Sequence, residues 1–102
     1  MSEEDKKFMA QKLEILRYIT PLIDVPLKYK KSVLTLLELT TNLKDNVQLS
    51  TRLEELYGIY KAFYKHVQGL RQMEHCLECM SQIKYIANHF QIEFNTEFII
   101  NM

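Results

Sequence analysis

Glycine and proline are scarce in this sequence, and this scarcity limits its possible folds more than any other feature. The 102 residues contain two glycines and two prolines, where average usage gives roughly 7 and 5. Sheet-containing folds need many tight turns, and these two residue types supply most of them. Apolar residues make up 47% of the chain, which is enough for a globular core. The sequence therefore predicts an all-α fold, a small antiparallel bundle of about four helices forming one domain over residues 1–102.

Caps and prolines bound the first two expected helices. Ser2 can cap a first helix, and the acidic residues that follow it favour the positive end of the helix dipole. Thr20-Pro21 ends this helix, because proline lacks an N–H and disfavours helix in the residue before it. A connector over 20–26 leads to a second helix over about 26–44. This helix is apolar around so much of its circumference that we expect it to be central.

The second half of the chain predicts two more helices. Thr51 and Glu54 have the spacing of a capping box, which predicts a third helix over about 51–67. Gly69 is a natural stop, because glycine tolerates the left-handed conformation at helix ends. A fourth helix over about 70–90 follows, with apolar residues at steps of three and four. The alternative is that Gly69 does not interrupt the chain and that 51–90 is one long helix of a coiled-coil dimer.

The pattern changes after the fourth expected helix. Apolar residues alternate with polar ones from Ile92 onward, which predicts a short extended segment, and a short helix capped by Asn95 is the alternative. Two phenylalanines, Phe94 and Phe98, lie among the isoleucines. Such a segment is too apolar to stay free in water, so it either packs back over the bundle or contacts another chain.

The sequence holds no pattern typical of catalysis. It has no glycine-bracketed serine, no phosphate-binding glycine loop and no HExxH pair. The pairs Glu3-Glu4 and Glu54-Glu55 stand at expected helix starts, where the helix dipole explains them. We therefore expect a protein that is not an enzyme and that needs no cofactor.

His75, Cys76 and Cys79 are the nearest match to a metal or redox site. His75 and Cys79 are an i, i+4 pair that could hold a metal ion on one helix face. Structural zinc sites, however, usually take four ligands from two separated pairs. Cys76 also falls on the apolar stripe, where a free cysteine behaves as a small hydrophobic residue. The spacing therefore favours core cysteines, and no metal is expected.

The charges of the chain balance. It has 13 basic and 13 acidic residues, whereas nucleic-acid-binding domains usually carry a basic excess. The run Lys28, Lys30, Lys31 is the best candidate for a nucleic-acid contact, but a charge run on a helix is usually only solvated. No apolar stretch has the length of a membrane span, and no signal-peptide pattern is present. We expect a cytoplasmic or nuclear protein with reduced thiols and no membrane partner.

The third expected helix has an aromatic stripe beside its core stripe. Tyr57, Tyr60 and Tyr64 recur at spacings of three and four, and Lys61 and Lys65 flank them. Tyrosine is enriched in interfaces because it combines a large apolar ring with a polar tip. The alternative is that these rings cover the seam between two helices of the bundle.

These patterns favour a non-catalytic protein–protein interaction module, which binds a helical or extended peptide of a partner in a regulatory complex. The predicted contact residues are Tyr57, Tyr60, Lys61, Tyr64, Phe94 and Phe98. The alternatives are a homo-oligomeric helical scaffold, such as a homodimer, and, less favoured, a nucleic-acid-binding domain. In number and size the expected helices resemble small modules of transcription coactivators and elongation factors, such as KIX-like or integrase-binding-type domains. No diagnostic motif accompanies this resemblance, so it assigns no residue a role.

Overall fold

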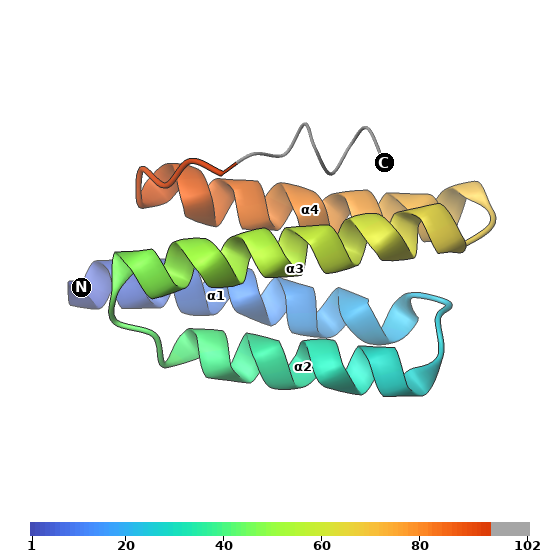
Figure 1. Cartoon of the computed structure of the whole chain (residues 1–102), viewed down its shortest axis with the longest axis horizontal. Helices are drawn as coiled ribbons and strands as arrows, with labels where there is room; N and C mark the ends of the chain where they lie inside the picture. Colours follow the sequence, from blue (N-terminus) through green and yellow to red (C-terminus); the bar gives the residue numbers. More distant parts are fainter. Residues whose placement is uncertain (95–102) are drawn as a thin grey trace.

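The computed structural model describes residues 1–94, and four helices in this part of the chain pack around one apolar core. Consecutive helices run in opposite directions (Figure 1). Both α1 and α3 contact α2 and α4, so the helices form a four-membered ring. The predicted all-α antiparallel bundle is thereby confirmed. The elements are α1 (Glu3–Ile19), the 3-10 helix η1 (Thr20–Leu22), α2 (Leu27–Thr41), α3 (Asn46–His66) and α4 (Leu70–His89).

Three predicted helix boundaries are confirmed. The side chain of Ser2 caps α1 by accepting a hydrogen bond of 3.1 Å from the backbone N–H of Asp5. The α-helix ends at Ile19, directly before Thr20-Pro21. Gly69 separates α3 from α4 with φ 92° and ψ 146°, a conformation that side chains with a Cβ rarely adopt. The alternative of a single helix over 51–90 is therefore wrong.

The predicted start of the third helix is wrong. α3 begins at Asn46, and the carboxylate of Asp45 caps it by accepting hydrogen bonds from the N–H groups of Val47 and Gln48. Thr51 lies inside the helix and donates its hydroxyl proton to the carbonyl of Val47. Because the stronger cap Asp45 lies six residues upstream of Thr51, the helix starts there, and the spacing of Thr51 and Glu54 is incidental.

The second helix is not central, contrary to expectation. α2 ends at Thr41 and buries three residues, Val33, Leu37 and Thr40, whereas α4 buries seven. Leu27, Tyr29 and Leu39 are largely exposed. In a ring of four helices each helix turns only part of its surface toward its two neighbours, so the surplus apolar surface of α2 faces outward.

A buried hydrogen-bond chain joins α3 to the end of α1. The Tyr60 hydroxyl lies 2.8 Å from Oγ1 of Thr20, which donates its own proton to the carbonyl of Leu16 at 2.6 Å. Tyr60 therefore donates to Thr20. Burial raises the pKa of the Tyr60 phenol, so this donor keeps its proton. All three residues are fully buried, and the chain satisfies polar groups that would otherwise be costly in the core.

The chain reverses at Gln91, directly after α4. The N–H of Ile92 bonds to the carbonyl of Ala87 at 2.8 Å and that of Gln91 to the carbonyl of Asn88 at 3.2 Å, the pattern of a Schellman motif. Gln91 has φ 55°, where glycine is the usual residue. This turn directs the chain back over the bundle, and Phe90, Ile92 and Phe94 pack against the core. The rest of the predicted C-terminal segment lies outside the described residues.

Replacing Tyr60 with phenylalanine removes the donor to Thr20 while keeping the ring. We expect Tyr60→Phe to lower the free energy of unfolding by about 1 kcal/mol, because Thr20 loses a buried partner. Urea denaturation measures this change. Tyr18→Phe is the matched control, since the Tyr18 side chain is exposed, and it should change stability by less than about 0.5 kcal/mol. Equal effects of the two substitutions would contradict the structural role of the bond.

Replacing Gln91 with glycine relieves the left-handed backbone of the Schellman turn. We expect Gln91→Gly to raise the free energy of unfolding by up to about 1 kcal/mol, measured in the same way. Gln68→Gly provides the matched control, because Gln68 is exposed and does not have positive φ. That variant should be destabilised by the added freedom of its unfolded chain. A loss of stability in Gln91→Gly would show that the turn is not formed.

Candidate functional site

The connector between α1 and α2 is held in place by α4. The backbone N–H of Asp24 donates to Oε1 of Gln72 at 2.6 Å, and Nε2 of Gln72 donates to the carbonyl of Leu22 at 3.0 Å. Ile23 and Val25, which follow η1, are buried in the core. These contacts determine where α2 begins relative to α3.

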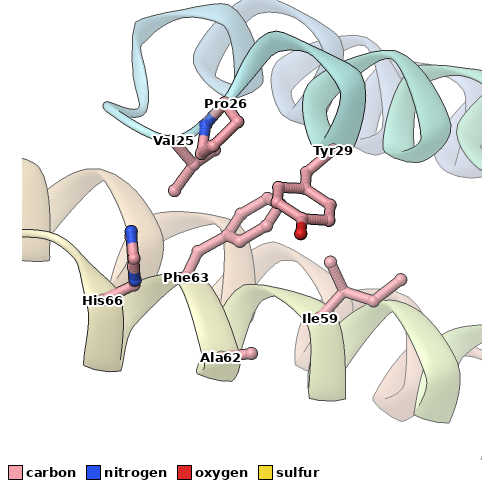
Figure 2. A pocket seen from close by; sticks show the side chains of 7 residues that line it. All are labelled: Val25, Pro26, Tyr29, Ile59, Ala62, Phe63 and His66. Atoms are coloured by element: carbon pink, nitrogen blue, oxygen red, sulfur yellow. The ribbon is translucent and has the colours of Figure 1, made fainter.

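An apolar groove lies between the start of α2 and the end of α3. Figure 2 shows Tyr29 extending from α2 toward Phe63 and Ile59 of α3. The groove has a volume of about 510 Å³, and its lining consists of Val25, Pro26, Tyr29, Ile59, Ala62, Phe63 and His66. Only His66 and the Tyr29 hydroxyl contribute polar side-chain atoms. A concave site with apolar walls and few polar groups is typical of places where proteins bind ligands or partner side chains.

A small residue on the groove wall leaves the groove open, and a contact between α2 and α3 bounds it on one side. Ala62 contributes one methyl group to the wall and is exposed, so a longer side chain at this position would fill part of the groove. Closer to the start of α3, the guanidinium of Arg52 bridges α3 and α2, because it lies 3.5 Å from the carbonyl of Leu36 on α2. The groove is therefore limited to the end of the α2–α3 contact that lies beside the connector.

One positively charged side chain, that of Lys28, lies at the rim of the groove. The ammonium group of Lys28 is 5.1 Å from the centroid of the Tyr29 ring, close enough for a cation–π contact. His66 lines the groove from α3. No carboxylate belongs to the lining, although Asp24 lies at an adjoining hollow that shares Val25, Pro26 and His66. The groove can therefore accept apolar side chains and offers positive charge at its edge.

The expected exposed tyrosine stripe on α3 is wrong at two of its three positions. Tyr57 is 1% exposed and Tyr60 is 0% exposed. Tyr60 is covered by the end of α1, where it bonds to Thr20. Tyr57 is covered by α4 and by the segment that follows it. The Phe94 ring packs edge-on against the Tyr57 ring with centroids 5.6 Å apart, and the Lys84 ammonium lies 5.6 Å from the Tyr57 centroid.

The remaining predicted contact residues do not gather at the groove. Lys61 and Tyr64 are both partly exposed, and the Lys61 ammonium lies 4.8 Å from the Tyr64 ring. Neither residue lines the groove. Phe94 is partly buried against Tyr57, and Phe98 lies outside the described residues. Of the three lysines of the predicted basic run, Lys30 turns toward the connector and donates to the carbonyl of Pro21.

Both cysteines are core residues, as the periodicity of α4 predicted for Cys76. Cys76 and Cys79 are free and fully buried. Burial raises the pKa of the Cys76 thiol to about 11 and also raises the pKa of Cys79. The thiolate is the reactive form, so these thiols are poorly suited to nucleophilic or redox chemistry. Within residues 1–94, no group of three or more histidine, cysteine or acidic side chains is placed to hold a metal ion.

The sequence pattern did not reveal a histidine–carboxylate pair between α1 and α4. Nε2 of His89 lies 2.8 Å from Oδ1 of Asp5, and the imidazole stacks on the Phe8 ring with centroids 4.0 Å apart. The hydrogen bond from His89 holds the pKa of the Asp5 carboxyl below its ordinary value. The two residues are 84 positions apart, so only the fold brings them together. The pair joins the start of α1 to the end of α4.

One signal in the sequence could have revealed the groove. Ile59, Phe63 and His66 recur at spacings of four and three, with Ala62 beside them, and this set forms a second face of α3. The spacing of Tyr57, Tyr60 and Tyr64 instead predicted a contact surface on a different face of α3. The part of the groove contributed by α2 could not be found in this way, because it depends on how the connector sets the start of that helix.

Comparison with known proteins identifies no relative. No family model matches the chain, and neither the curated proteins nor the solved structures include a significant match. The similarity to KIX-like and integrase-binding-type modules therefore remains one of helix number and size. Among the described residues, no helix has the length and apolar character needed to cross a membrane.

The Asp5–His89 contact predicts a specific acid dependence of stability. The pKa of Asp5 is lowered from 3.8 in the folded chain. A lowered pKa stabilises the fold above pH 3.8, and this contribution is lost as the pH falls through the lowered value. Urea midpoints of the wild type and Asp5→Asn should therefore converge below about pH 3.8. Glu4→Gln, which removes one charge from the same helical turn, is the control. A gap between wild type and Asp5→Asn that is independent of pH would contradict the contact.

Proposed function

We propose that this protein is a non-catalytic interaction module that binds an apolar helix or extended peptide of a partner protein in the α2–α3 groove. The observation that carries the proposal is the groove itself, an open hollow of about 510 Å³ with apolar walls. Helix-in-groove recognition uses such a surface to receive apolar side chains from successive turns of a partner helix. The predicted tyrosine surface is not part of the proposal, because two of its rings are buried.

The apolar residues around the groove support a binding role. Leu27 is largely exposed directly after Pro26, and Tyr29 is exposed on one groove wall. Exposed apolar surface that adjoins a hollow is more typical of an interaction site than of an isolated surface residue. The other prominent hollows are each lined by at least three charged, amide, imidazole or aliphatic hydroxyl side chains, whereas His66 is the only such side chain in the lining of the groove. Partner binding here would remove Tyr29 and Leu27 from water.

The chemistry of the polar groups also favours binding over catalysis. The buried cysteines have raised pKa values, and the Asp5–His89 pair lies between α1 and α4, away from the α2–α3 groove. His66 is the only titratable side chain other than tyrosine that lines the groove. The free thiols favour a reducing compartment, so we place the partner complex in the cytoplasm or nucleus.

The test is to select groove-binding peptides and map where they bind. A displayed library of amphipathic helices is selected against the wild-type protein, and binding of the enriched peptides is measured by fluorescence anisotropy. Ala62→Trp fills the groove from an exposed position and should weaken binding by about tenfold or more. Ala10→Trp is the matched control, because Ala10 is exposed on α1, and it should leave binding unchanged. Circular dichroism checks that both variants keep their helicity.

Two outcomes would overturn the proposal. The first is a selection without binders. The second is a set of peptides whose affinity is the same for Ala62→Trp and Ala10→Trp, which would place the interaction elsewhere. Light scattering over a tenfold concentration range tests the alternative of a homo-oligomeric scaffold. The proposal expects the mass of one chain, and a dimer that Ala62→Trp dissociates would assign the groove to self-association instead.

A further inference from the structure

The charges of this neutral chain are separated along the long axis of the bundle. The α1–α2 connector and the turn at Gly69 between α3 and α4 lie at the same end of the bundle (Figure 1). We define the connector end as the helix halves nearest these two turns, which are residues 12–34 and 57–79. It contains eight lysines and arginines against four acidic residues. The opposite end, residues 1–11, 35–56 and 80–94, contains five basic and eight acidic residues. The balanced total therefore conceals a basic end and an acidic end.

Apolar side chains are exposed at the same basic end. Leu70 is 73% exposed at the start of α4, Leu27 is 62% exposed at the start of α2, and Leu22 of η1 is 49% exposed. Four basic side chains at this end are also exposed. They are Lys28 and Lys31 on α2, Lys65 on α3 and Arg71 on α4. The groove opens at this end, between Pro26 and His66. Apolar and positive groups thus occur together at the end of the bundle where the groove lies.

We propose that the partner segment bound in the groove is an acidic amphipathic helix, whose apolar residues enter the groove and whose carboxylates face the basic connector end. This inference rests on the proposed function and specifies the chemistry of its partner. The excess of basic residues at the connector end, beside an apolar groove, is the observation that carries it. A positive field around an apolar site raises the association rate of negatively charged partners and disfavours positive ones.

The shape of the site favours a peptide over an anionic lipid surface. A membrane surface would contact exposed tips such as Leu22 and Leu70 but would leave a recessed hollow unfilled. The groove walls, Ile59 and Ala62 among them, need a convex occupant such as one face of a helix.

The test compares three synthetic helical peptides that share one leucine stripe and carry glutamate, glutamine or lysine at the flanking positions. We expect the glutamate peptide to bind at least about tenfold more tightly than the lysine peptide at low salt. At high salt the difference should shrink to about threefold or less. Lys28→Glu should reduce the preference severalfold. Lys44→Glu, the same charge change at the acidic end of the bundle, is the control and should leave the preference largely intact.

The outcomes separate this inference from the proposed function. If all three peptides bind equally and Ala62→Trp weakens each of them, the groove binds helices but the acidic partner is wrong. If none of the peptides binds, and library selection also fails, the proposed function itself is wrong. Vesicles containing anionic lipid provide the third probe. Binding to these vesicles that Lys28→Glu weakens, without a preference for the glutamate peptide, would assign the basic end to a membrane surface.

Discussion

The hydroxyl of Tyr60 reaches from α3 to Thr20, and this buried hydrogen bond joins the middle of the bundle to the point where the first helix ends. Thr20 in turn bonds to the carbonyl of Leu16, so the last turn of α1 is tied to the core. Ile23 is buried a few residues later, and Gln72 holds the backbone on both sides of it. The path of the connector, and with it the start of α2, depends on these contacts.

The groove follows from this arrangement of the connector. Pro26 and Tyr29 are held at a position where they face α3 across a space that Ala62 does not fill. The apolar surface of α2 exceeds what its two neighbours can cover, which leaves Leu27 and Leu39 exposed. Leu27, which is left uncovered at the start of α2, therefore adjoins the groove that we propose as the binding site. A well-packed interior elsewhere, with Leu13, Leu53 and Ile83 fully buried, keeps this surface on a rigid support.

Local signals in the sequence were sufficient for the fold class and for several boundaries. The Ser2 cap, the Thr20-Pro21 stop and the Gly69 break act through backbone chemistry within a few residues, so they can be read without tertiary information. The location of the site depended on packing between distant segments. Tyr57 and Tyr60 have the spacing of a surface stripe, but Phe94 and Thr20 cover them from positions that no periodicity on α3 can indicate. The separation of charge was likewise hidden until the antiparallel arrangement placed four half-helices at each end.

If the groove is open to solvent in the isolated protein, a water-soluble paramagnetic probe reaches the methyl groups that line it and increases their relaxation rates. The exposed methyl of Ala62 and the partly exposed methyls of Ile59 line the groove, whereas those of Leu53 and Leu56 lie in the core. In a dilute sample the probe should relax the Ala62 and Ile59 methyls strongly and leave the two leucines nearly unaffected. Protection of the Ala62 and Ile59 methyls equal to that of the leucines would show that the groove is closed or already occupied, and would contradict an open binding site.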